Sequence, residues 1–273
     1  MTEPLWPQPM DLHEAFTWTV HGEKLRGEVR FAKYKPDSLS NDDWEALLGP
    51  DVNNLGHLED TYRLARAGLA RLRQTQPGFY TPAEEHLIEI ASITHDWPEA
   101  LVGDISYGDK TPEQLDREYG VFVMMIGHLC GHASSKVFEA CTQVVFNSDT
   151  KTGQGFEAVE RVGYTRTALR AQRHLAENTA PAVAVPGMRW LVADVLARQV
   201  PALVEASETF VPVADYLKWQ RSTITQGFEY LLKVPDVFVN YGDRQGRMRS
   251  MFNDSFAAWR GWLKATEALP KSA

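Results

Sequence analysis

The apolar positions of the chain repeat with helical spacing from residue 53 onward. Between Asn53 and about Gln74, one face carries His57, Leu64, Ala65, Gly68 and Leu72. Between Pro82 and about Asp96, one face carries Ile88, Ala91 and His95. Residues three or four positions apart share one face of an α-helix, so the pattern predicts two amphipathic helices that bury these faces.

Start and stop signals fix the ends of the second helix. Thr81 comes directly before Pro82, as expected of an N-cap residue followed by a proline in the first turn. Pro98 predicts the end of the helix, because a proline disfavours the α conformation of the residue before it. His95 and Asp96 are therefore expected at a helix end.

Further helical patterns cover most of the remaining chain. They are expected at about 44–48, 111–130, 134–146, 156–176, 188–209, 213–233 and 249–267, with loops at 99–111 and 147–155 and a linker at 180–187. Residues 16–20 and 25–31 alternate apolar and polar positions around a turn that contains Gly22, which predicts a short β-hairpin. The expected fold is mostly α.

The same pattern suggests how the chain is divided. We expect an irregular N-terminal segment over 1–50, a helical core over 51–178 and a C-terminal helical extension over 188–270 that packs on the core. One helical face near the end carries Phe252, Phe256, Trp259 and Trp262. This aromatic stripe either packs within the chain or forms the interface of a homo-oligomer, and the sequence does not choose between the two.

The composition excludes several classes of protein. Of the 273 residues, 44% are hydrophobic and 23% charged, and the net charge of −8 is not the basic excess of a nucleic-acid-binding chain. No uncharged apolar run reaches about 18 residues, and the N-terminus lacks the pattern of a signal peptide. Two cysteines are too few for a disulfide framework or a thiolate zinc site. We therefore expect a cytoplasmic enzyme or binding module with no membrane partner.

Two histidines and an aspartate carry the candidate chemistry. His57 and His95 lie on the apolar faces of successive helices, which can direct both imidazoles into one interhelical pocket, where helical bundles hold metals. Asp96 can face the same pocket as His95 only because the helix ends there. Taken singly, a histidine on an apolar face is more often a satisfied core residue than a metal ligand. Together, imidazole nitrogens and a carboxylate suit a divalent ion such as Mn, Co, Fe, Ni or Zn.

A motif extends this group. Residues 95–104 read His-Asp-x-x-Glu-x-x-x-Gly-Asp, with His57 upstream. With these residues, the region of about 50–175 resembles the HD-domain metal-dependent phosphohydrolases, and within them the branch of bacterial 5′-deoxynucleotidases and their eukaryotic relatives. The resemblance implies an HD-domain helical bundle with one divalent ion, Mg included among the candidates.

The resemblance also implies roles for individual residues. His57, His95 and Asp96 would be metal ligands, and Glu99 and Asp104 would be the catalytic carboxylates. Removing either carboxylate should then reduce turnover more than metal occupancy, whereas removing a ligand should release the metal.

Three features depart from the pattern of the family. Its fourth ligand is normally an aspartate on a later helix, and the position that aligns with it here is Glu160. Asp149, in a predicted loop, is a rival, and a third alternative is that neither binds the metal. The branch usually has a glutamate directly before the first histidine, where this chain has Gly56. The region after the linker has no counterpart in the small nucleotidases.

The function implied is hydrolysis of a nucleotide, with a (deoxy)nucleoside 5′-monophosphate as the first expected substrate. A nucleoside triphosphate hydrolase is an alternative, for which Arg244, Arg247 and Arg249 would supply positive charge. An alarmone hydrolase is less favoured, because that branch usually has Glu-Asp where this chain has Glu99-Ala100. The alternative outside enzymes is a non-catalytic regulatory module with the HD fold, suggested by Glu160 and by the long C-terminal region.

Overall fold

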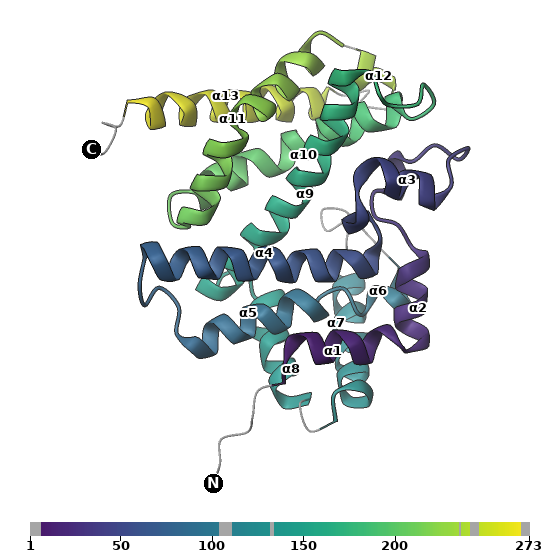
Figure 1. The fold of residues 1–273 in the computed structure, drawn as a ribbon, viewed down its shortest axis with the longest axis vertical. Helices are drawn as coiled ribbons and strands as arrows, with labels where there is room; N and C mark the ends of the chain where they lie inside the picture. Colours follow the sequence, from purple (N-terminus) through teal and green to yellow (C-terminus); the bar gives the residue numbers. More distant parts are fainter. Residues whose placement is uncertain (1–6, 104–110, 132–133, 235, 241–245, 269–273) are drawn as a thin grey trace. The chain divides into compact units, whose positions relative to one another are not determined.

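The structure, a computed structural model, describes residues 7–103, 111–131, 134–234, 236–240 and 246–268. Within these ranges the chain is helical and contains no β-strand, apart from an isolated antiparallel bridge between Val29 and Asn53. The expected mostly α fold is confirmed (Figure 1). The chain forms two compact units, one of residues 1–30 and 50–160 and one of residues 31–49 and 161–273. The expected division into 1–50, 51–178 and 188–270 stays a prediction.

The first unit contains the two helices expected to carry the histidines. Its elements are α1 (Pro9–Thr17), α2 (Val20–Gly27), α4 (Asn54–Thr75), α5 (Pro82–Thr94), α6 (Glu99–Val102), α7 (Pro112–Leu129), α8 (Ser134–Ala140), a π-helical turn (Cys141–Val145) and the beginning of α9 (Lys151–Glu177). The α4 helix packs along α5, which also contacts α1 and α8. The buried face of this layer includes Leu58, Ile88 and Ile90, each at most 2% exposed.

The predicted N-terminal β-hairpin is wrong, because residues 9–27 form α1 and α2. The hydroxyl of Thr19 accepts a hydrogen bond from the backbone N–H of Gly22 and so caps α2. A Cβ atom on Gly22 would lie 2.4 Å from the carbonyl oxygen of Phe16, so this glycine permits a tight corner between two helices. Trp18 and Val20 are 80% and 75% exposed, and the apparent alternation therefore did not mark one buried face.

The predicted start and end of α5 are confirmed. Thr81 and Glu84 form a reciprocal capping box, and Pro82 occupies the first turn. The α-helical hydrogen bonds end at His95, whose N–H donates to the carbonyl of Ala91. Residues 99–102, expected as a loop, form the short helix α6 directly after Pro98. His95 and Asp96 therefore occupy the turn between two helices.

The loop predicted at 147–155 is shorter than expected, because α9 begins at Lys151. The hydroxyl of Thr150 accepts from the N–H of Gly153, as an N-cap residue does. A Cβ atom on Gly153 would lie 2.1 Å from the carbonyl oxygen of Asn147, so this glycine allows the preceding turn to approach the helix. The early start places Glu160 in the third turn of a regular helix.

The second unit contains the C-terminal helices. Its elements are a 3₁₀ turn (Ala32–Tyr34), α3 (Asn41–Leu48), the rest of α9, α10 (Val185–Ala206), α11 (Val211–Leu232), α12 (Asp236–Asn240) and α13 (Arg247–Glu267). The α10 helix, which begins inside the predicted linker, packs along α11 and α13.

The aromatic stripe of α13 packs within the chain. Phe252 and Trp259 have no exposed surface, and the ring of Phe256 stacks on that of Phe228 with centroids 4.9 Å apart. Trp262 stacks on Trp259 and donates a hydrogen bond to the hydroxyl of Ser207. The stripe is thus an internal contact of the second unit.

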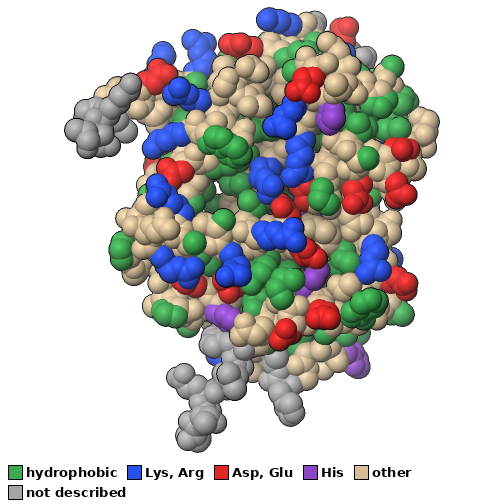
Figure 2. All heavy atoms as spheres, in the orientation of Figure 1, with side chains coloured by type: hydrophobic (Ala, Val, Ile, Leu, Met, Phe, Trp, Pro, Cys, Tyr) green, Lys and Arg blue, Asp and Glu red, His purple; other side chains and the backbone are tan. Residues whose placement is uncertain are grey.

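Basic and acidic side chains are interspersed on the face shown in Figure 2. On α4, three arginines lie beside acidic partners: Arg63 with Glu59 at 2.6 Å, Arg66 with Glu89 at 3.7 Å and Arg73 with Glu85 at 2.6 Å. These three arginines therefore do not form a patch of one sign. Among the described helices, none combines the length and the apolar character that a membrane span needs.

A buried histidine of α1 that contacts a glutamate of α4 makes stability depend on pH. His13 is 5% exposed, and its Nε2 lies 3.3 Å from Oε1 of Glu59. Burial lowers the pKa of His13 below its ordinary 6.5, and the Glu59 carboxylate opposes only part of this shift. As the pH falls below 6.5, the unfolded chain binds the proton first, so the folded protein loses stability.

We therefore predict that His13→Gln removes the part of the stability loss at low pH that comes from this histidine. Urea unfolding between pH 8 and pH 5 should show the variant gaining stability relative to the wild type as the pH falls. Other histidines titrate in both proteins, so the difference isolates His13. A difference that stays constant over the whole pH range would contradict the prediction.

Candidate metal centre

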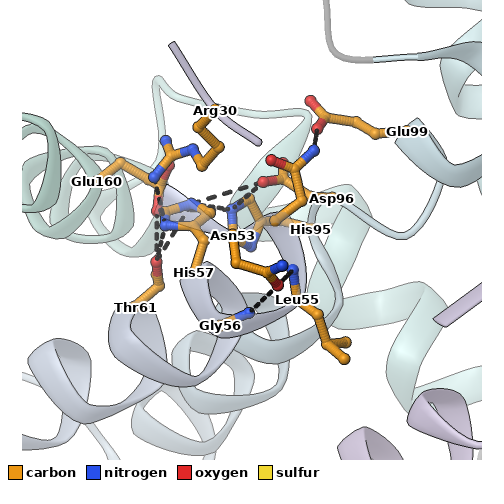
Figure 3. A network of polar contacts seen from close by, with 11 residues as sticks. Arg30, Asn53, Leu55, Gly56, His57, Thr61, His95, Asp96, Glu99 and Glu160 are labelled. Atoms are coloured by element: carbon orange, nitrogen blue, oxygen red, sulfur yellow. Dashed lines mark hydrogen bonds and ion pairs between the residues drawn. The ribbon is translucent and has the colours of Figure 1, made fainter. Parts of the chain in front are cut away.

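The predicted convergence of His57, His95 and Asp96 is confirmed. His57 comes from the first turn of α4, and His95 and Asp96 from the turn after α5. One potential ligand atom from each lies within 4.8 Å of the others, and Figure 3 shows the three side chains pointing toward one another. His57 is 2% exposed and His95 6%. This cluster could hold a metal ion.

Glu160 of α9 also reaches the cluster. Its Oε1 lies 3.4 Å from Nε2 of His57 and 3.5 Å from Nε2 of His95. Its rival Asp149 is exposed in the turn before α9, whereas the cluster is buried. Of the two candidates for a fourth ligand, Glu160 is therefore the one that lies beside both imidazoles.

The spacing of the three atoms of His57, His95 and Asp96 suits one small cation. The two Nε2 atoms are 3.2 Å apart, and Oδ2 of Asp96 lies 3.2 Å from Nε2 of His95 and 3.5 Å from Nε2 of His57. Ligands bonded at about 2.1 Å to one tetrahedral or octahedral ion are separated by about 3.0–3.4 Å. Two carboxylates with two neutral imidazoles also carry the charge that balances a divalent ion.

The pKa shifts within the cluster show that its carboxylates favour a positive charge beside them. Burial opposes the charged form of His95, but the carboxylates of Asp96 and Glu160 outweigh burial and hold the pKa of this ring well above its ordinary value. Burial likewise opposes charge on Asp96, but His95 and His57 outweigh it and lower its pKa to about 2. The pKa of Glu160 is lowered well below its ordinary value by the same two rings against burial. Without a metal, His95 therefore supplies the cation.

Arg30 adds a second positive charge beside His57. Backbone hydrogen bonds from Arg30 to Val52 and from Asn54 to Glu28 hold its segment next to the start of α4. The guanidinium lies 2.5 Å from Nδ1 of His57, and burial followed by this charge lowers the pKa of that ring. A guanidinium only donates hydrogen bonds, so Nδ1 accepts, and a neutral ring then carries its proton on Nε2. A metal at Nε2 would require this contact to loosen.

The structure describes one of the two carboxylates that are expected to be catalytic. Glu99, at the start of α6, is 6% exposed, and its Oε2 accepts a hydrogen bond of 3.4 Å from the side-chain amide of Asn54. In Figure 3 its carboxylate lies apart from the four clustered side chains. Asp104 lies outside the described residues.

Residue 56, where the resemblance would place a glutamate, has no room for a side chain. A Cβ atom on this residue would lie 2.3 Å from the carbonyl oxygen of Pro50, so any side chain there requires the backbone to move. Asn53 caps the helix at the same place, accepting hydrogen bonds from the N–H groups of Leu55 and Gly56. The first turn of α4, which carries His57, therefore depends on glycine.

Sequence reasoning missed Arg30, Asn54 and Thr61. The hydroxyl of Thr61 lies 3.0 Å from Oε1 of Glu160, and the residue follows His57 by one helical turn, which is a signal that could have been used. Arg30 is brought to the site by backbone pairing between distant segments, and no local pattern marks it.

Comparisons with protein-family models, with curated proteins and with solved structures find no match to this chain. The resemblance to HD-domain phosphohydrolases therefore depends on the motif residues alone. What the site can do chemically has to be argued from its geometry.

Gly56→Ala tests the packing that places His57. The added methyl group must displace the carbonyl of Pro50, and we predict a loss of about 1–3 kcal/mol in the free energy of unfolding, measured with urea. The matched control is Gly120→Ala on α7, where a Cβ atom meets nothing within 4 Å. Equal effects of the two substitutions would contradict the prediction.

Arg30→Gln tests the influence of the buried guanidinium. Removing this charge relieves its repulsion of a divalent ion and leaves Nδ1 of His57 free to carry the ring proton. We predict that the affinity for Mn²⁺, measured by titration calorimetry, rises about tenfold. Weaker or unchanged binding by a variant of normal stability would show that Arg30 does not compete with the ion.

Proposed function

We propose that this protein is a metal-dependent phosphohydrolase that releases phosphate from a nucleotide, with a (deoxy)nucleoside 5′-monophosphate as the first expected substrate. The observation that carries the proposal is the buried group of His57, His95 and Asp96, whose ligand atoms lie within 4.8 Å of one another, with Oε1 of Glu160 3.4 Å and 3.5 Å from the two imidazoles. The nucleotide enters through the resemblance of residues 95–104 to the HD-domain motif.

The donor set fits a divalent ion bound by two nitrogens and two oxygens. This mixture suits Mn, Co, Fe, Ni or Zn better than Mg, which prefers oxygen ligands and water. When bound, such an ion lowers the pKa of a water molecule and neutralises charge on a phosphoryl oxygen. Four protein ligands leave positions for water and substrate if the ion is octahedral.

The residues around the ligands have distinct tasks in this proposal. Glu99, buried at the start of α6, would orient the attacking water or protonate the leaving 5′-oxygen, and Asp104 would take the other role. Asn54 donates to one carboxylate oxygen of Glu99, which restricts how that side chain can turn. Burial of the cluster limits the competing bulk water and strengthens each electrostatic contact.

The alternatives differ in what the same site would do. A triphosphate hydrolase needs additional positive charge near the ion. Arg244, Arg247 and Arg249 are the arginines proposed to supply it, and Arg244 lies outside the described residues. A non-catalytic regulatory module would bind the metal or nucleotide without releasing phosphate. The geometry favours neither over the monophosphate reaction.

Metal analysis and a nucleotide panel test the proposal together. The purified protein should contain about one equivalent of a divalent transition metal, and one class of nucleotide should yield inorganic phosphate. Asp96→Asn should lose the metal and the activity. Phosphate release that is unchanged in Asp96→Asn would exclude the proposed reaction, and metal binding without release from any nucleotide would favour the regulatory module.

Two further substitutions separate ligand and catalytic roles. Glu99→Gln should keep the metal but lower phosphate release about 10²–10⁴-fold, the range for loss of a proton-transfer group. Glu160→Gln should weaken metal binding, whereas Asp149→Asn, in the exposed turn, should leave it unchanged. Loss of metal in Glu99→Gln would make Glu99 a ligand and contradict its assigned role.

A further inference from the structure

We infer that Thr61 is the positioning residue for the fourth metal ligand, fixing the carboxylate of Glu160 in the orientation that binds the ion. The inference rests on the proposed function, since it assigns Glu160 to the metal. It adds a residue that the HD-domain motif does not include. The role is carried by contacts within the first unit and does not depend on the substrate.

The hydroxyl of Thr61 lies at the centre of the polar contacts on α4. Its Oγ1 is 3.0 Å from Oε1 of Glu160, and 3.3 Å and 3.4 Å from Nδ1 and Nε2 of His57. Thr61 is 1% exposed, so water does not compete for its proton. Figure 3 shows Thr61 directly beside His57 and Glu160.

The single hydroxyl proton has one preferred acceptor. The carboxylate of Glu160 is the nearest of these partners, and an ionised carboxylate can only accept a hydrogen bond. A hydrogen bond to an ionised acceptor is stronger than one to a neutral ring. Thr61 therefore donates to Oε1 of Glu160, the oxygen that faces both Nε2 atoms of the cluster.

This bond compensates for the length of the glutamate. Glutamate has one more rotatable bond than the aspartate expected at this position, so its carboxylate has more orientations to lose when it binds an ion. The side chain of a threonine in a helix is restricted at its first torsion, which makes its hydroxyl a fixed point. Holding Oε1 in place before the ion arrives reduces the entropy that binding costs.

The test compares Thr61→Val, which keeps the shape but removes the hydroxyl, with Thr61→Ser, which keeps the hydroxyl. The control is Thr165→Val, another fully buried threonine, whose hydroxyl donates only to the carbonyl of Arg161 on its own helix. The probe is Co²⁺ added to the metal-free full-length protein. Its dissociation constant and visible absorption spectrum are recorded, and urea unfolding of each metal-free variant checks the fold.

We expect Thr61→Val to weaken Co²⁺ binding about 10–100-fold, the usual effect of removing a partner of a metal ligand, and to change the Co²⁺ spectrum. Thr61→Ser and Thr165→Val should bind within about threefold of the wild type. In a Glu160→Ala background, Thr61→Val should have little further effect, because the hydroxyl then has no carboxylate to hold.

The outcomes separate the inference from the proposed function. Wild-type protein that binds Co²⁺ and releases phosphate, together with unchanged binding and spectrum in Thr61→Val, overturns the role of Thr61 alone. Wild-type protein that binds no Co²⁺ overturns both. If Thr61→Val does not fold, Thr61→Ala replaces it, and equal Co²⁺ binding by the alanine and serine variants also overturns the inference.

Discussion

Two carboxylates held beside two imidazoles in a buried place create a demand for positive charge that the protein must meet. Asp96 and Glu160 have side chains only 17% and 14% exposed, and burying an uncompensated carboxylate is costly. The metal-free protein meets the demand with a protonated His95 and with Arg30 nearby. A divalent ion held by His57, His95 and Asp96 would meet it with a single group. Either protons or a bound metal ion could therefore balance the charge of the carboxylates.

Three breaks in regular helix bring these side chains together. The N-cap of Asn53 starts α4 just before His57, Pro98 follows the turn that carries His95 and Asp96, and the cap by Thr150 starts α9 early enough to place Glu160 within it. Helix ends are where a chain can direct neighbouring residues to one point, because successive side chains of a continuous helix diverge by about 100°. The capping residues thus define the site as directly as the ligands do.

How far the sequence could predict the structure depends on the range of the interactions involved. The cap of α5 and the face shared by Ile88, Ala91 and His95 follow from local rules, and these predictions are confirmed. The corner between α1 and α2 was misjudged, because Gly22 fits both a hairpin turn and a close approach of helices. Arg30 could not be predicted, because the bridge between Val29 and Asn53 that places it joins segments without a shared pattern.

The cluster accommodates two residues that the resemblance did not lead us to expect. The carbonyl of Pro50 occupies the space of a side chain at Gly56, and His57 in the same turn still reaches the cluster. Oε1 of Glu160 lies 3.4 Å and 3.5 Å from the two imidazoles, although glutamate is longer than the expected aspartate. Charged groups buried this closely need compensating partners, because an unpaired buried charge is costly. The cluster could therefore hold a metal ion despite both differences.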